Sequence, residues 1–166
     1  MKTHWIIDSP LGPLTLVAND NGAICGLHMD GPSRSNTARN YGQRKAAGFE
    51  QAIEQLDAYF AGKLHEFDLE LAPEGNPFQL EVWKQLLLIP FGKTRSYGEI
   101  AEAVGDRMLA RSVGTACGSN PIPVIIPCHR VIGSDGSLVG FGGGLKRKEF
   151  LLHHENPERP IALTLF

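Results

Sequence analysis

The stretch Ala72-Pro73-Glu74-Gly75-Asn76-Pro77 constrains the fold most, because its prolines and glycine interrupt any helix or strand near the middle of the chain. The 166 residues are enough for one good core or two small ones. Asn76 is a good N-cap and Pro77 a good first helical residue, so a helix is expected where the stretch ends. We therefore predict an N-terminal domain over residues 1–72, a linker over 73–77 and a C-terminal domain over 78–166.

The residues before the linker predict a small antiparallel sheet with one helix against it. Apolar runs that favour strands occupy residues 4–8, 14–18 and 23–29. The Asn21-Gly22 pair predicts a hairpin between the last two runs, because it tolerates positive φ. Apolar residues at three- and four-residue steps over 49–60 predict a helix, and alternation over 66–71 predicts a strand. Residues 30–47 are polar without periodicity and predict a loop.

The residues after the linker predict a mainly helical domain. Helical spacing of apolar side chains predicts helices over 78–87, 96–104, 108–116 and 146–154. Pro90 is expected to stop the first of them, and Gly105-Asp106 to form a turn between the second and third. With Arg107 and Arg111 outside, this pair has the outline of a helix-turn-helix. Two short helices around a glycine are more often a simple αα corner, so the pattern alone leaves DNA contact open.

Charge and cysteine content narrow the function classes. The formal net charge is -2 and the pI about 6.3, which does not point to a polyanionic partner. Residues 92–155 carry eight Lys or Arg against six Asp or Glu, which allows nucleic-acid contact through a small face. No stretch is apolar enough for a signal peptide or a membrane span, so we predict a cytoplasmic protein without a membrane partner. The three cysteines are widely spaced, and we expect reduced thiols, no metal and no cofactor.

An apolar run from Pro123 stops at Cys128-His129-Arg130, which sets a thiol beside an imidazole. The run favours a buried strand or extended segment that delivers a nucleophile next to its base, with Glu155 as third member. Neighbouring side chains of an extended segment point to opposite faces, so Cys128 and His129 then need a bend or a bridging water. A buried structural cysteine is one alternative, and a hydrolase that uses the same trio for acyl transfer is another.

The full stretch from Asn120 to Gly133 resembles the active-site signature of the O6-alkylguanine-DNA alkyltransferases, also called methylated-DNA-protein-cysteine methyltransferases. The resemblance continues, in the family's order and spacing, at Phe78, Trp83, Pro90, Ser96-Tyr97-Gly98-Glu99-Ile100-Ala101, Arg111, Val113-Gly114, Gly142-Gly143-Gly144 and Lys148-Glu149-Phe150-Leu151-Leu152. It covers residues 76–156 closely. The stretches Ser9-Pro10-Leu11-Gly12 and Tyr59-Phe60-Ala61-Gly62 are similar to the family's more variable N-terminal domain.

The resemblance implies both a fold and an activity. The implied fold is α+β, with a ribonuclease H-like N-terminal domain and a C-terminal helical domain that contains a winged-helix-like helix-turn-helix. The implied activity is direct DNA repair by irreversible, stoichiometric transfer of an alkyl group from O6-alkylguanine, and also from O4-alkylthymine, to Cys128. Because a thioether has no easy hydrolysis route, such a methylated-DNA-protein-cysteine S-methyltransferase acts once per molecule.

The resemblance also assigns catalytic roles to five residues. Cys128 is the alkyl acceptor, His129 deprotonates it through a water, and Glu155 orients the imidazole. Tyr97 is expected to donate to N3 of the departing guanine, which lowers the cost of expelling the base. Asn120 braces the turn before the active-site segment through backbone hydrogen bonds.

The substrate implied by the resemblance is a base flipped out of double-stranded DNA, since O6 of a stacked guanine cannot be reached. The residues expected to line its pocket are Pro123, Val131, Phe141, Gly142 and Gly143. Arg111 is expected to enter the base stack from a helix in the minor groove, with Ala110 and Tyr97 as further DNA contacts. The protein is expected to act as a monomer, with cooperativity along DNA left open.

Three departures from the family pattern limit what the resemblance implies. Phe141 stands where many relatives carry tyrosine and Gly142 where some carry serine, so a side-chain hydroxyl near O6 is missing. The range of accepted alkyl groups therefore stays open. Asn19 occupies the position of a zinc ligand of some animal relatives, so no structural zinc is expected.

A non-catalytic binder of damaged DNA, in which Cys128 is a bystander, is a further alternative.

Overall fold

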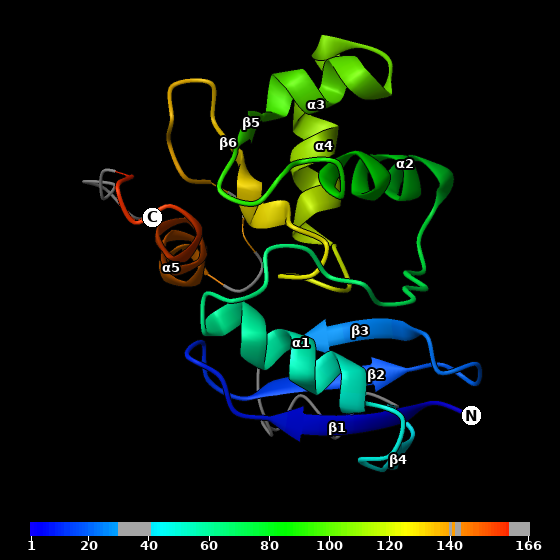
Figure 1. Ribbon diagram of the computed structural model, residues 1–166. Coiled ribbons are helices and arrows are strands. Elements are labelled where there is room, and N and C mark those ends of the chain that lie inside the picture. Colours follow the sequence, from blue (N-terminus) through cyan, green and yellow to red (C-terminus); the bar gives the residue numbers. More distant parts are fainter. Residues whose placement is uncertain (30–40, 140, 142–143, 160–166) are drawn as a thin grey trace. The chain divides into compact units, whose positions relative to one another are not determined.

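The computed structural model describes residues 1–29, 41–139, 141 and 144–159, and the chain divides into two compact units, Met1–Glu74 and Gly75–Phe166. The first unit holds a small sheet and one helix, and the second is mainly helical (Figure 1). This confirms the predicted α+β class. In the described part of the chain, no helix is long and apolar enough to cross a membrane.

The N-terminal unit is built on a four-stranded sheet in the order β3-β2-β1-β4. Its strands are β1 (Thr3–Ile7), β2 (Leu14–Ala18), β3 (Ile24–His28) and β4 (Gln43–Arg44). The predicted β2–β3 hairpin is confirmed, because the two strands pair antiparallel and Gly22 turns with a φ of 80°. The side-chain oxygen of Asn19 accepts from the backbone N–H groups of Asn21 and Ala23, which fixes the turn.

The helix of this unit, α1 (Glu50–Phe60), has the predicted position and an apolar face. Leu56 and Tyr59 on that face are fully buried, as is every residue of β2. A half-exposed sheet and an amphipathic helix each have one apolar surface, and burying these surfaces supplies the core.

Two N-terminal predictions are wrong. Of the predicted 30–47 loop, residues 30–40 lie outside the described residues, and 43–44 form the short strand β4, which pairs parallel to β1, so the sheet is mixed rather than purely antiparallel. The predicted strand over 66–71 makes only an isolated bridge between Ile24 and Leu71. Its side chains do alternate between half-buried and exposed, but the backbone N–H and C=O of Asp68 bond to the side chain of Gln55 instead of a neighbouring strand.

The C-terminal unit contains four α-helices, α2 (Pro77–Leu86), α3 (Tyr97–Val104), α4 (Ala110–Gly118) and α5 (Leu145–Glu155), within its described residues. The predicted cap at Asn76 is confirmed and forms a capping box with Gln79. Ser96 and Glu99 form a second capping box at the start of α3. Reciprocal caps of this kind satisfy two orphan backbone donors and fix where each helix begins.

The helix-turn-helix outline is confirmed by α3, α4 and the 3-10 turn η2 (Arg107–Leu109) between them. Val113 of α4 is fully buried, whereas Arg107 and Arg111 are exposed, as predicted. Helix α2 supports the pair, because the indole N–H of Trp83 donates to the backbone oxygen of Ala116 at 2.9 Å inside the core. The exposed face of α4 is therefore held on a rigid base.

A two-stranded parallel sheet, β5 (Arg95–Ser96) with β6 (Val131–Ile132), was not predicted. Strand β5 leads directly into Tyr97, and β6 directly follows Arg130. The pairing therefore ties the start of α3 to the end of the Cys-His-Arg stretch, although more than thirty positions separate them in the sequence.

Candidate functional site

The Cys128 segment is a chain of tight turns, not the predicted strand or extended segment. Residues Cys128–Arg130 form the 3-10 turn η3. Before it, the backbone N–H of Ile126 donates to the oxygen of Ile122 at 2.8 Å, and Val124 has a φ of 74°, a strained value for a β-branched residue. The prediction failed because Pro121, Pro123 and Pro127 lack the backbone donors that a strand needs.

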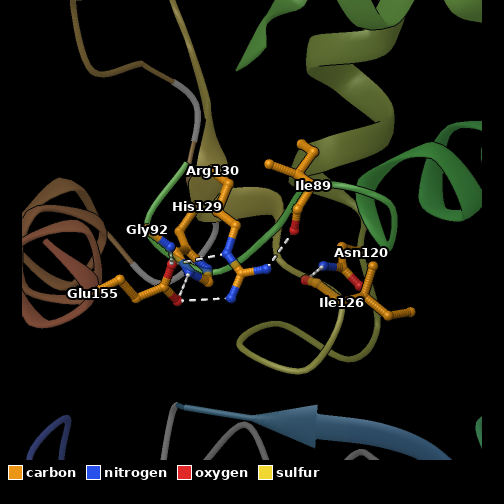
Figure 2. A network of polar contacts seen from close by, with 7 residues as sticks. All are labelled: Ile89, Gly92, Asn120, Ile126, His129, Arg130 and Glu155. Carbon is orange, nitrogen blue, oxygen red and sulfur yellow. Dashed lines mark hydrogen bonds and ion pairs between the residues drawn. The ribbon is translucent and has the colours of Figure 1, made fainter. Parts of the chain in front are cut away.

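Asn120 holds these turns together through its side chain. Its amide nitrogen donates to the backbone oxygen of Ile126 at 2.8 Å (Figure 2). Its side-chain oxygen accepts from the backbone N–H of Ile122 at 2.9 Å. The side chain of Asn120 thus bonds to a residue six positions later, in the segment that leads into Cys128. These are the backbone contacts expected of Asn120.

His129, Arg130 and Glu155 form a buried polar cluster (Figure 2). The imidazole Nε2 of His129 lies 2.7 Å from Oε2 of Glu155. The guanidinium of Arg130 donates from Nε to Oε1 at 2.8 Å and from Nη2 to Oε2 at 3.0 Å. The backbone N–H of Gly92 also donates to Oε1 at 3.2 Å. The structure thus brings together two of the predicted catalytic residues at the junction of η3 and the end of α5.

The electrostatics of this cluster set the protonation states. Burial alone would raise the pKa of Glu155, but hydrogen bonds from His129 and Arg130 outweigh it and hold the pKa well below its usual range. Burial lowers the pKa of His129 despite the neighbouring carboxylate. The imidazole is therefore neutral, and its Nε2–H donates to Glu155. Its Nδ1 is left as the acceptor, buried and without a hydrogen-bond partner among the described residues.

Cys128 is buried with 3% of its surface exposed, and burial raises the pKa of its thiol to about 11. At neutral pH the group is therefore a thiol that needs a base before it can act as a nucleophile. Cys117 of α4 is also buried, and burial together with the charge of Cys128 raises its pKa to about 12. Of the two, only Cys128 directly precedes an imidazole.

Tyr97 shares a backbone acceptor with a residue that was not predicted, Lys148. The phenol of Tyr97 donates to the backbone oxygen of Val139 at 2.6 Å. The ammonium of Lys148 donates to the same oxygen at 2.8 Å and to the phenol oxygen at 3.3 Å. Burial raises the pKa of Tyr97, so the phenol keeps its proton. Burial lowers the pKa of the fully buried Lys148 to about 8.

The remaining predicted residues fall into two groups. Val131 and Phe141 are buried and Pro123 is half-buried, whereas Gly142 and Gly143 lie outside the described residues. Ala110 and Arg111 start the first turn of α4, with Ala110 half-buried and Arg111 exposed. No three His, Cys, Asp or Glu side chains are grouped as metal ligands in the part of the chain that the structure describes.

Comparison with known proteins matches both halves of the chain. The ribonuclease-like domain of 6-O-methylguanine DNA methyltransferase matches residues 3–73, and the DNA binding domain of the same family matches residues 77–157. The methylated-DNA-protein-cysteine methyltransferase of Mycobacterium tuberculosis (strain ATCC 25618 / H37Rv) is 51% identical over 170 aligned positions, covering 100% of this chain and 99% of the relative. That of Methanosarcina barkeri is 50% identical, covering 90% of this chain and 94% of the relative.

A solved structure agrees with the sequence matches. The crystal structure of Mycobacterium tuberculosis OGT in complex with DNA matches the fold with a TM-score of 0.85 at 49% identity, covering 95% of each chain. Family models match both halves of the chain, and the relatives match along nearly their whole length. The chain therefore belongs to the 6-O-methylguanine DNA methyltransferase family.

Proposed function

We propose that this protein repairs DNA by transferring a methyl or larger alkyl group from O6 of guanine to the sulfur of Cys128. The observation that carries the proposal is the neutral His129, whose Nε2–H is held by Glu155 at 2.7 Å while Nδ1 stays available as a base. Family membership makes the chain a methylated-DNA-protein-cysteine methyltransferase, and the buried thiol that precedes this base is its best acceptor.

The reaction is a single displacement at the alkyl carbon. The proton of the Cys128 thiol passes through a bridging water to Nδ1 of His129, and Glu155 stabilises the resulting imidazolium. The thiolate forms a bond to the alkyl carbon while the bond between that carbon and O6 breaks. The electron pair of the broken bond stays on the guanine. The phenol of Tyr97 donates to N3 of the leaving base. The product is S-alkylcysteine, and with no step that removes the alkyl group each protein molecule acts once.

Double-stranded DNA is the proposed partner. A relative at 49% identity was solved in complex with DNA, and α4 presents the exposed Arg111 on its first turn. We place α4 in the minor groove, with Arg111 filling the space of a flipped base and Ala110 against the sugar-phosphate surface. The protein acts as a monomer. We assign the base pocket to Pro123, Val131 and Phe141, and we propose O4-alkylthymine as a second substrate.

A labelled substrate tests the proposal. The protein is incubated with a duplex that carries O6-methylguanine with a radiolabelled methyl group, and the label is followed over time. We expect at most one label per protein molecule, and no transfer by Cys128→Ser although that variant still binds the duplex. Cys117→Ser is the matched control and should transfer normally.

The same assay separates two other functions. Release of label as free methanol with repeated turnover would indicate a hydrolase. Tight binding of the methylated duplex without transfer would indicate a binder of damaged DNA, in which Cys128 is a bystander. The three cysteines are free, which fits a reducing compartment, and we place the protein in the cytoplasm.

A further inference from the structure

We propose that Arg130 is a positioning residue that neutralises the carboxylate of Glu155 and thereby keeps His129 uncharged, ready to accept the proton of Cys128. Only the effect of Arg130 on the rate of alkyl transfer rests on the proposed function. The charge state of His129 itself is a property of the folded protein and is measured without DNA.

The geometry of Arg130 is that of a fork on one carboxylate. Its Nε and Nη2 reach different oxygens of Glu155, at 2.8 and 3.0 Å, while Nε2 of His129 shares Oε2 at 2.7 Å. The side chain of Arg130 is 8% exposed and that of Glu155 is 1% exposed, so water screens the pair little. A bidentate guanidinium is the strongest partner that a buried carboxylate can have.

A second set of contacts fixes the guanidinium in place. Nη1 of Arg130 donates to the backbone oxygen of Ile89 at 2.6 Å, and its central carbon lies 5.9 Å from the ring centroid of Phe91 (Figure 2 shows the Ile89 contact). Gly92 of the same loop donates to Oε1 of Glu155. The 89–92 loop therefore contacts both members of the ion pair and restrains the guanidinium against Glu155.

The net charge of the Glu155, His129 and Arg130 side chains explains why Arg130 helps His129 act as a base. A buried carboxylate with an imidazole as its main partner favours the charged imidazolium, which cannot accept a proton from a thiol. With Arg130 present, the cluster is neutral when His129 is neutral, and protonating the imidazole adds an uncompensated buried charge. The charged groups that influence His129 are Glu155, Arg130 and Lys148, and the two cations both oppose protonation.

The lowered pKa of His129 supports this reading. Burial is the largest cause of the lowered pKa, the hydrogen bond and charge of Glu155 oppose it, and the charges of Arg130 and Lys148 add smaller effects in the same direction as burial. An arginine directly after the Cys-His step thus lets a carboxylate orient the imidazole without making it a permanent cation.

Replacement of Arg130 tests the inference. The titration of the His129 imidazole is followed by NMR in wild type and in Arg130→Met, with the signal assigned by its loss in His129→Gln. We expect the midpoint in Arg130→Met to rise by about one pH unit or more. The acid limb of the single-turnover transfer rate should move to higher pH by the same amount. The double variant Arg130→Met/Glu155→Gln has neither the guanidinium nor the carboxylate. In it, both the shift of the His129 midpoint and the shift of the acid limb should disappear.

Two results would overturn the inference. One is a His129 midpoint that stays unchanged in folded Arg130→Met, because a merely structural arginine alters stability alone. If Arg130→Met does not fold, Arg130→Gln, which keeps a hydrogen-bond donor without the charge, replaces it, and an unchanged midpoint in that variant counts equally against the inference. Absence of transfer in wild type would refute the proposed function instead, since the titration uses protein without DNA.

Discussion

Nε2 of His129 and Oε2 of Glu155 lie 2.7 Å apart, and neither side chain is more than 1% exposed. A carboxylate at the end of α5 therefore fixes the orientation of an imidazole 26 positions earlier in the chain. Because Nε2 is engaged by Glu155, Nδ1 is the other ring nitrogen, and we propose that it accepts the proton of the Cys128 thiol.

The cluster should make the protein sensitive to acid. Folding lowers the pKa of His129 from its ordinary 6.5 and that of Glu155 from 4.5. The unfolded chain then binds more protons, so the free energy of unfolding falls as pH drops below about 6.5, by at most about 1.4 kcal/mol per pH unit for one proton. Urea denaturation between pH 7 and 5 measures the slope. His129→Gln should flatten it, and an equal slope in both proteins would contradict the assignment.

Arg111→Ala should separate base flipping from chemistry. Arg111 is exposed on α4, whereas His129, Arg130 and Glu155 are buried, so its loss should leave the chemistry intact but slow transfer from duplex O6-methylguanine at least tenfold. Reaction with free O6-benzylguanine, which needs no flipping, should change little. Single-turnover rates on both substrates measure this. The matched control is Arg107→Ala, an exposed arginine that pairs with Glu102, and equal losses on both substrates in Arg111→Ala would refute the role.

Lys148→Met should make the protein more stable and less active. Folding lowers the pKa of Lys148 from 10.5 to about 8, so the buried ammonium costs stability below pH 8, a cost that disappears as pH rises toward 10.5. Removing it should raise the free energy of unfolding at pH 7 by about 1–2 kcal/mol after the lost hydrogen bonds are counted. Transfer should slow, because Tyr97 loses the donor to its phenol oxygen.

The control for this prediction is Lys146→Met, an exposed lysine on the same helix, which should leave both stability and rate unchanged. Chemical denaturation and single-turnover transfer are measured on the same preparations. A large loss of stability in Lys148→Met would show that its contacts with Val139 and Tyr97 outweigh the burial of its charge.

Asn120→Ala should loosen the Cys128 segment. It removes one donor to Ile126 and one acceptor for Ile122, so we expect a loss of about 1–3 kcal/mol in stability and a slower transfer. Asn120→Asp keeps the acceptor for Ile122 but sets a carboxylate oxygen against the backbone oxygen of Ile126, so it should be at least as destabilising as Asn120→Ala. Equal stability of all three proteins would show that the turns hold without this side chain.

The elements that the sequence predicted best are those with a local cause. The Asn21-Gly22 turn, the cap at Asn76 and the apolar face of α1 each follow from residues within a few positions of one another. The strands β4, β5 and β6 have two residues each, too few for any alternation to appear. Their pairing depends on segments far away in the chain.

The site was predicted unevenly for a similar reason. His129 and Glu155 were named from the Cys-His step in the sequence and Tyr97 from the family resemblance, and their assigned roles stay predictions. Lys148 was named only within the matched stretch Lys148-Glu149-Phe150-Leu151-Leu152 and was given no role at the site, because the run Lys146-Arg147-Lys148 looks like a solvated face. Only the packing of α5 shows that the third of these cations is fully buried. The 73–77 linker and the pocket residues Gly142 and Gly143 also stay predictions.

The most direct test is to locate the transferred methyl group. After reaction with an excess of duplex O6-methylguanine, the protein is digested, and peptides that contain Cys25, Cys117 and Cys128 are weighed by mass spectrometry. We predict that only the Cys128 peptide gains the mass of one methyl group, to near completion. A methyl group on Cys25 or Cys117, or a fully unmodified protein beside a demethylated duplex, would contradict the account.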